Sequence, residues 1–201
     1  MLARPRILEA ARALFIEQGL DVSLDSIATA AGTTRQTLYN HFASKATLLA
    51  EVFETFKTGL QDPIVDAESS ERPLENLLHS LACAVQAHFY DAQVLRMQRL
   101  LILAQVQMPE LLAEMQLRRN SSVRKLLAAA LEQRHLRGEI VVEYPDDAAK
   151  AFLGAVVGPM FPGVLHGGEL PDADELARLR HEVCRTFLLA WKAADGVTPA
   201  P

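Results

Sequence analysis

Features of secreted, metal-binding and membrane proteins are scarce in the sequence. There are two cysteines, Cys83 and Cys184, and neither belongs to a Cys-x-x-Cys pair, so a disulfide framework or a zinc site is not expected. The most apolar stretch, residues 151–165, contains glycine and proline and is shorter than the roughly 20 residues of a membrane-spanning helix. The first residues have the pattern of an amphipathic helix and not of a signal peptide. We therefore expect a cytoplasmic protein with no membrane contact and two buried, reduced thiols.

Enzyme motifs are absent as well. The sequence contains no Gly-x-Ser-x-Gly, no glycine-rich phosphate loop and no His-Glu-x-x-His. Two metal-binding histidines on one helix face would be four residues apart, whereas His79 and His88 are nine apart. We therefore expect a protein that is not an enzyme and that holds neither a metal ion nor another cofactor.

Strand patterns are almost missing, and helical patterns take their place. The only short β-like run is residues 139–144, which lie between Gly138 and Pro145. Half of the residues are hydrophobic, which is enough for a core. Elsewhere apolar residues recur at helical spacing between glycine, proline and Asp/Ser positions that begin or end helices. The sequence predicts an all-α protein of about nine helices, at residues 5–18, 24–31, 34–41, 45–59, 73–90, 91–106, 109–136, 146–165 and 173–194.

Residues 24–45 have the pattern of a helix, a tight turn and a second helix. Gly32 lies at the centre of the turn and supplies the backbone freedom that such a turn requires. Ile27, Leu38 and Phe42 are expected to be buried, which leaves the polar residues of the second helix exposed. Arg, Gln and Thr at the start of such a helix can reach base edges in a major groove of DNA. A glycine turn between two helices is also common in purely structural settings, so this pattern alone leaves both interpretations open.

The charge distribution is compatible with a DNA-binding segment at the N-terminus. The net charge of the whole chain is −5, which by itself argues mildly against nucleic acid as a partner. Residues 1–50, however, hold five Lys or Arg residues against four Asp or Glu residues, so the acidic excess lies further along the chain. An electrostatic footprint on DNA is local, so an acidic remainder does not exclude it.

About 45 residues, from the first predicted helix to the start of the fourth, resemble the TetR (tetracycline-repressor) family of transcriptional regulators. The matching residues of the first helix are Ile7-Leu8-Glu9-Ala10-Ala11-Arg12-Ala13-Leu14-Phe15, followed by Gly19. Those of the second half are Ile27-Ala28, Ala31-Gly32, Thr33-Thr34, Leu38-Tyr39, His41-Phe42, Ser44-Lys45 and Leu48-Leu49. The chain departs from the family pattern at Thr33, where Val is usual, at Ala43, where Pro is frequent, and at Ala46-Thr47, where Glu is common.

The resemblance implies a helix-turn-helix DNA-binding domain at residues 1–45 and a helical ligand-binding and dimerisation domain at residues 46–195. The residues expected to face DNA are Thr34, Arg35, Gln36, Thr37, Tyr39, Asn40, His41 and Lys45. Arg35 suits guanine and Gln36 suits adenine, and the others are expected to position the DNA backbone. Lys45 opposes the dipole in the first turn of its helix, a conflict that a nearby phosphate would relieve.

The second domain is expected to bind an effector and a second copy of the chain. Residues 96–115, with their Arg-rich start and Pro109-Glu110-Leu111, also resemble the AefR-like C-terminal subgroup. The predicted pocket residues are Phe53, Phe56, Leu81, Val85, His88, Phe89, Met97, Leu101, Met108, Leu112 and Met115. The predicted dimer-interface residues are Gly154, Gly158, Leu176, Leu179, Val183, Phe187 and Trp191. The pocket residues suit an ordinary core equally well, and the alternative for the dimer residues is burial within one subunit.

Together these features predict a homodimeric repressor that binds a palindromic operator in double-stranded DNA. A small apolar or aromatic effector would release it by favouring a conformation whose two reading helices are wrongly spaced for DNA. The alternative is an all-helical interaction module that does not bind DNA.

Overall fold

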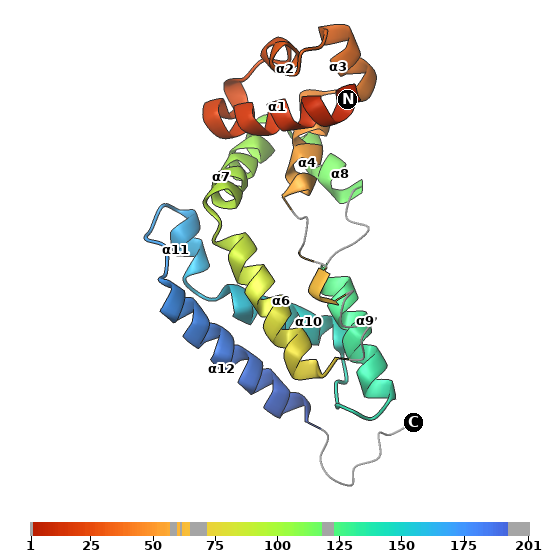
Figure 1. The fold of residues 1–201 in the computed structure, drawn as a ribbon, viewed down its shortest axis with the longest axis vertical. Helices are drawn as coiled ribbons and strands as arrows, with labels where there is room; N and C mark the ends of the chain where they lie inside the picture. Colours follow the sequence, from red (N-terminus) through yellow and green to blue (C-terminus); the bar gives the residue numbers. More distant parts are fainter. Residues whose placement is uncertain (1, 57–59, 61, 65–71, 118–122, 193–201) are drawn as a thin grey trace. The chain divides into compact units, whose positions relative to one another are not determined.

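The computed structural model describes residues 2–56, 60, 62–64, 72–117 and 123–192, and the described part is all-α (Figure 1). Its helices are α1 (Ala3–Gln18), α2 (Leu24–Ala30), α3 (Arg35–His41), α4 (Lys45–Thr55), α6 (Leu74–Phe89), α7 (Ala92–Gln107), α8 (Glu110–Leu117), α9 (Val123–Leu136), α10 (Pro145–Val157), α11 (Phe161–Leu165) and α12 (Ala173–Trp191). A short 3-10 helix, η1 (Gly19–Asp21), follows α1. In these ranges the only β-type pairing is an isolated bridge between Ile140 and Lys192, so the predicted fold class is confirmed.

Two of the predicted helices are divided in the structure. The apolar stretch at 146–165 forms α10 and α11, because Gly158 ends α10 with a φ of +82° that only glycine adopts easily. The single helix predicted at 109–136 is described as α8 and α9, and residues 118–122 lie outside the described part. The predicted ends of the fourth and the last helix, at residues 59 and 194, also lie outside it.

The chain forms two compact units. The first unit contains α1 to α4 together with α7 and α8, and the second contains α6 and α9 to α12. This division crosses the predicted functional boundary at residue 45, because α4 packs on both α1 and α8, and α7 packs on α1. The functional domains themselves remain a prediction.

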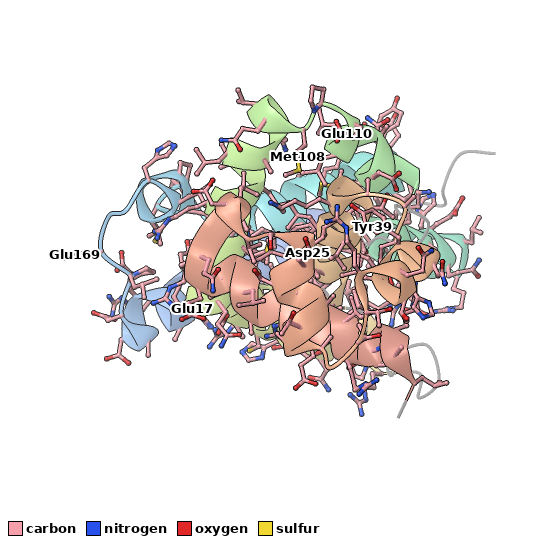
Figure 2. All side chains as sticks on the ribbon, turned by 90° about the horizontal axis from the view of Figure 1, so that it is seen from above. Glu17, Asp25, Tyr39, Met108, Glu110 and Glu169 are labelled. Carbon is pink, nitrogen blue, oxygen red and sulfur yellow. The ribbon has the colours of Figure 1, made fainter. Side chains whose placement is uncertain are left out.

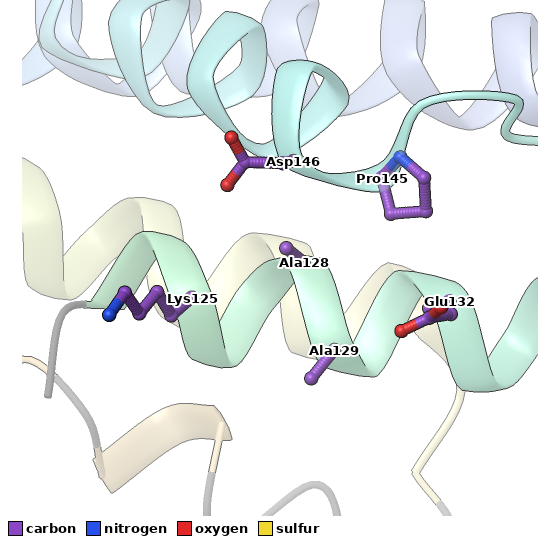
Figure 3. A pocket seen from close by; sticks show the side chains of 6 residues that line it. All are labelled: Lys125, Ala128, Ala129, Glu132, Pro145 and Asp146. Atoms are coloured by element: carbon purple, nitrogen blue, oxygen red, sulfur yellow. The ribbon is translucent and has the colours of Figure 1, made fainter.

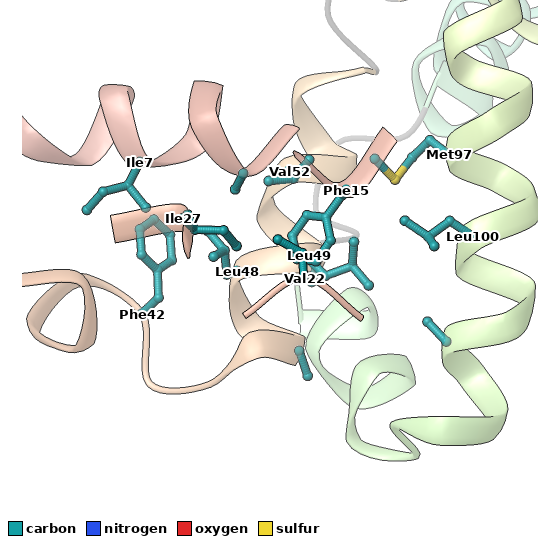
Figure 4. Close-up of a cluster of buried hydrophobic side chains, with 14 of the residues drawn as sticks. Ile7, Phe15, Val22, Ile27, Phe42, Leu48, Leu49, Val52, Met97 and Leu100 are labelled. Carbon is teal, nitrogen blue, oxygen red and sulfur yellow. The ribbon is translucent and has the colours of Figure 1, made fainter. Parts of the chain in front are cut away.

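The core of the first unit is built around α1. Ile7, Ala11 and Phe15 recur at four-residue spacing, so they form one buried face of this helix. Residues of α2, α3, α4 and α7 pack against that face (Figure 4). Leu38 and Phe42 are fully buried in the same cluster, which anchors the middle and the carboxyl end of the short helix α3. The first unit therefore holds α3 as part of a packed body.

The core of the second unit is centred on Phe152 of α10. Its ring makes edge contacts with Phe187 at 5.4 Å and lies 6.3 Å from the ring of Trp191, both on α12. α10 also packs along α9 and α6. Two side chains at the end of α6 cap the carboxyl end of α10: Gln86 donates to the Val156 carbonyl at 3.2 Å, and Tyr90, the residue after α6, donates to the Val157 carbonyl at 2.6 Å.

Candidate nucleic-acid interface

Local chemistry defines the two helices of the predicted reading motif. Ser23 caps α2 by accepting a hydrogen bond from the Ser26 amide at 3.0 Å, and Thr34 caps α3 by accepting one from the Thr37 amide at 3.1 Å. Gly32 takes a φ of +60° in the turn between them. The predicted short helix near residues 34–41 is confirmed as α3. Its first turn is free of the core, since only Leu38 among its residues is buried.

Replacing Gly32 with alanine is expected to lower the free energy of unfolding by roughly 1–2 kcal/mol. The reason is backbone strain at a φ of +60°, since the nearest side-chain atom, an Nη of Arg6, lies 3.6 Å from the position of the new Cβ, an ordinary contact. Chemical denaturation followed by circular dichroism measures the change. Gly163→Ala is the matched control, because Gly163 lies in α11 with negative φ and open space around it. Equal stabilities for the two variants would contradict this account of the turn.

Arg35 is exposed and held on the surface by two partners. An Nη of Arg35 lies 2.7 Å from an Asp25 carboxylate oxygen, and the guanidinium carbon lies 5.4 Å from the centre of the Tyr39 ring. Figure 2 shows Asp25 and Tyr39 on the same exposed surface of the first unit. The hydrogen bond to Tyr39 and the negative charge of Asp25 raise the pKa of Arg35 above its ordinary value. Arg35 therefore offers a permanent, oriented cation at the start of α3.

The other predicted α3 residues form a polar surface around Arg35. Gln36 donates to the Asn40 side-chain oxygen at 3.0 Å, one turn further along the helix. His41 is exposed at the end of α3, whereas Thr37 is half-buried with its hydroxyl 2.9 Å from that of Thr34. Gln36, Asn40 and His41 are thus free of the core, and their hydrogen-bonding groups face solvent or one another.

Lys45 differs from the sequence-based expectation. Its ammonium group donates to the backbone carbonyl of Leu20, next to the end of α1. Partial burial lowers the pKa of Lys45, and the charge of Asp21 opposes that shift. The cation in the first turn of α4 therefore has an acceptor inside the chain, so its position alone does not argue for a phosphate. Its role in binding DNA remains a prediction.

Asp25 and Arg6 lie near α3 but were not predicted as site residues from the sequence. Tyr39 was predicted, because it lies one helical turn after Arg35, a spacing that can be read from the sequence. Asp25, in contrast, lies ten residues before Arg35 on another helix, and Arg6 lies on α1 beside Gly32. Only the three-dimensional crossing of the helices brings these two residues to the turn.

The predicted pocket residues lie in both compact units. In the first unit, Phe56, Met97 and Leu101 are buried in the core, Phe53, Met108 and Met115 pack against it, and Leu112 is exposed. In the second, Leu81 and Val85 are buried, and Phe89 packs against the core and contacts His88 and Phe161. Nothing in either arrangement tests their role in binding an effector, which remains a prediction.

The first unit and the second unit each have a surface hollow that is lined by residues other than the predicted pocket residues. An open groove of about 330 Å³ lies between α9 and α10 and is lined by Lys125, Ala128, Ala129, Glu132, Pro145 and Asp146 (Figure 3). A second, of about 370 Å³, is lined by Pro5, Leu8, Glu9, Arg12 and Thr55. Neither lining includes a predicted pocket residue, so neither hollow is the predicted effector site.

The predicted dimer residues lie on α10 and α12, and several serve the core of their own chain. Val183 and Trp191 are buried there, and Phe187 packs on Phe152 and Trp191. Gly158 allows a close crossing, because a Cβ at this position would lie 2.7 Å from a Leu179 methyl group. Packing within one subunit thus accounts for Leu179, Val183, Phe187 and Trp191 of the apolar stripe on α12. Dimerisation remains a prediction that this packing does not test.

The described residues offer few other groups that could bind a metal ion or react. No group of three His, Cys, Asp or Glu side chains there could hold a metal ion, and no helix there is long and apolar enough to cross a membrane. Both cysteines are free thiols. Cys184 is buried, and burial raises its pKa to about 11, whereas Cys83 is only half-buried and so departs from the expectation of two buried thiols.

Two family models match the sequence. Residues 7–52 match the bacterial regulatory proteins of the tetR family. Residues 76–193 match the C-terminal domain of AefR-like transcriptional repressors. A curated relative, the HTH-type transcriptional repressor BepR of Brucella suis, is 29% identical over 171 residues, which are 82% of this chain and 81% of the relative.

Solved structures have the same fold. A TetR-family regulator from Mesorhizobium loti is 27% identical with a TM-score of 0.81, and the match covers 94% of this chain and 96% of that one. NalD of Pseudomonas aeruginosa, the secondary repressor of the MexAB-OprM multidrug efflux pump, is 25% identical with a TM-score of 0.65, over 96% and 98% of the two chains. These relatives are transcriptional regulators and not enzymes. The chain therefore belongs to the TetR family of bacterial transcriptional regulators, with an AefR-like C-terminal domain.

Proposed function

We propose that the protein is a homodimeric, ligand-responsive repressor that binds a palindromic operator in double-stranded DNA through α3 of each copy. The observation that carries this proposal is the surface of α3, where Arg35 and Gln36 are exposed while Leu38 anchors the helix in the core. In a helix-turn-helix protein such a surface enters the major groove. DNA reading is assigned to residues 1–45, and effector binding and dimerisation to residues 46–195, in the cytoplasm of a bacterium.

Arg35 reads a guanine in this proposal, and it must leave Asp25 to do so. Both partners of the ion pair are largely exposed, with 61% and 58% of their side-chain surfaces accessible. An exposed pair of this kind stabilises by about 0–1 kcal/mol. A bidentate contact from Arg to guanine contributes about 1–3 kcal/mol of discrimination. The free energy of the base contact therefore exceeds that of the ion pair. Asp25 orients Arg35 in the free protein, and Arg35 can exchange Asp25 for the guanine.

The remaining contacts position the protein on DNA. Gln36 would replace its bond to Asn40 with two bonds to an adenine edge. Backbone positioning is assigned to Thr34, Thr37, Tyr39, Asn40, His41 and Lys45. The Thr34 hydroxyl accepts from the Thr37 amide, and its proton is available to a phosphate oxygen when the Thr37 hydroxyl, 2.9 Å away, is the donor of their shared hydrogen bond.

Dimerisation and effector binding are assigned to the second domain. Gly154 of α10 is exposed with open space beside it, which permits close approach of a helix from a second copy, and Leu189 of α12 is 61% exposed. Two copies would address half-sites a whole number of DNA turns apart. The predicted pocket residues are rich in methionine and phenylalanine, which suit an adaptable site for an apolar or aromatic compound. A relative that represses a multidrug efflux pump supports an effector of this class.

Arg35→Ala is expected to weaken binding to the operator by about 1–3 kcal/mol, and to relax the preference at one base pair of each half-site. Fluorescence anisotropy with the DNA upstream of the protein's own gene, and with variants of each base pair, measures both effects. Arg137→Ala is the matched control, because Arg137 is also exposed and also pairs with a carboxylate, Glu139, at 2.5 Å, outside the helices proposed for DNA binding and dimerisation.

Salt titration of the wild-type complex tests DNA binding itself. A protein that contacts phosphates shows a steep fall of log affinity with log salt concentration. A flat dependence, as expected for an all-helical interaction module, would end the proposal. An unchanged base preference in Arg35→Ala would remove the assigned role of Arg35 alone.

A further inference from the structure

Arg6 differs from Arg4, Arg12 and Arg35, the other arginines of α1 and α3, because no partner for it lies in the described part of the chain. Arg4 pairs with Glu51, Arg12 donates to Gln93 and stacks on Phe56, and Arg35 pairs with Asp25. Arg6, by contrast, makes no ion pair or hydrogen bond with the described part of the chain, and its Nε is buried without an acceptor. Burial of the Nε–H without an acceptor is costly, whereas the two Nη groups reach solvent and can bind a partner outside the chain.

The position of Arg6 indicates what that partner is. One of its Nη atoms lies 3.6 Å from the place that a Cβ on Gly32 would take, so the guanidinium lies against the turn between α2 and α3. This turn comes two residues before Thr34, the cap of α3. In the proposed function, the amino end of α3 enters the major groove, and the residues beside it face the DNA backbone.

A role inside the protein explains only part of this arrangement. The guanidinium lies near the carboxyl end of α2, where the helix dipole favours a cation. No carbonyl of that end accepts a hydrogen bond from Arg6, however, so its planar set of N–H donors stays unused within the described chain. Such a fork of donors matches a phosphate group better than a lysine does.

We propose that Arg6 is a phosphate-binding residue that clamps the operator backbone beside α3. This inference rests on the proposed function and adds a contact from α1, outside the helix-turn-helix motif. The contact is independent of base sequence, because every nucleotide offers the same phosphate. Arg6 therefore contributes to the affinity for any duplex, whereas Arg35 and Gln36 contribute to the choice between sequences.

The test compares the salt dependence of DNA binding in variants of the full-length chain. Arg6→Gln is expected to reduce the slope of log affinity against log salt concentration by about 0.9 for each bound copy. It is expected to do so equally on the operator and on a scrambled duplex. Arg6→Lys keeps the charge and is expected to keep most of the slope. Arg96→Gln is the matched control, because Arg96 is exposed on α7 of the same unit, and it is expected to keep the wild-type slope.

Thermal unfolding of the same variants separates the contact from a role in folding. A wild-type slope in Arg6→Gln, with a lower melting temperature, would assign Arg6 to the end of α2 and overturn the inference. An equal loss of slope in Arg6→Gln and Arg6→Lys, or in Arg6→Gln and Arg96→Gln, would also overturn it. If the wild-type protein itself bound no DNA, the proposed function would fail, which is a different outcome from a wild-type slope in Arg6→Gln.

Discussion

Phe42→Ala is expected to lower the free energy of unfolding of the first unit by about 3–5 kcal/mol and to abolish operator binding. Phe42 is fully buried, and its amide donates to the Leu38 carbonyl at 2.9 Å, so it closes the carboxyl end of α3. The guanidinium of Arg4 lies 5.6 Å from the centre of its ring, a contact that alanine would also remove. α3 is too short to be stable alone, so its place depends on such anchors.

Denaturation followed by circular dichroism and DNA binding followed by anisotropy measure the two effects of Phe42→Ala. Phe42→Leu is the control, because it retains most of the apolar volume and is expected to cost less than about 1.5 kcal/mol. A Phe42→Ala protein with wild-type stability and operator affinity would show that α3 is positioned by something other than this core.

Phe152→Ala is expected to lower the stability of the second unit by about 3–5 kcal/mol. The change leaves a cavity between α10 and α12 and removes the ring contacts with Phe187 and Trp191. Because the proposed dimer surface lies on these same two helices, the variant is also expected to shift from dimer toward monomer. Chemical denaturation and analytical ultracentrifugation measure stability and assembly in one set of samples.

Leu136→Ala is the control for Phe152→Ala, because Leu136 ends α9 in the same unit and is 72% exposed. A surface change of this kind is expected to alter the stability by no more than about 0.5 kcal/mol. Similar effects of the two substitutions would mean that Phe152 does not form the centre of the second core. A wild-type protein that sediments as a monomer at all concentrations would contradict the proposed dimer.

Helix boundaries that depend on local chemistry were predictable from the sequence. Ser23, Ser44 and Asp172 were expected to precede helices, and each accepts a hydrogen bond from an amide in the first turn. The glycine of the turn and the buried positions of α3 were predictable for the same reason, because they depend on residues close in the chain. The family pattern then predicts that the surface of α3 faces DNA.

Features that depend on distant residues were not predictable. The packing of α7 and α8 into the first unit follows from contacts with α1 and α4, which no local pattern encodes. The pairing of Asp25 with Arg35 and the placement of Arg6 on the Gly32 turn depend on how three helices cross. The apolar stripe of α12 shows the same limit, because periodicity predicts a buried face but not which partner buries it.

Guanine-N7 methylation interference with the wild-type protein and Arg35→Ala tests most directly whether α3 reads the major groove. A methyl group on N7 blocks the contact that an arginine makes with guanine. The account predicts one guanine in each half-site whose methylation weakens binding of the wild-type protein and has no effect on the variant. Identical interference patterns in the two proteins, or no interference at any guanine of the bound site, would contradict it.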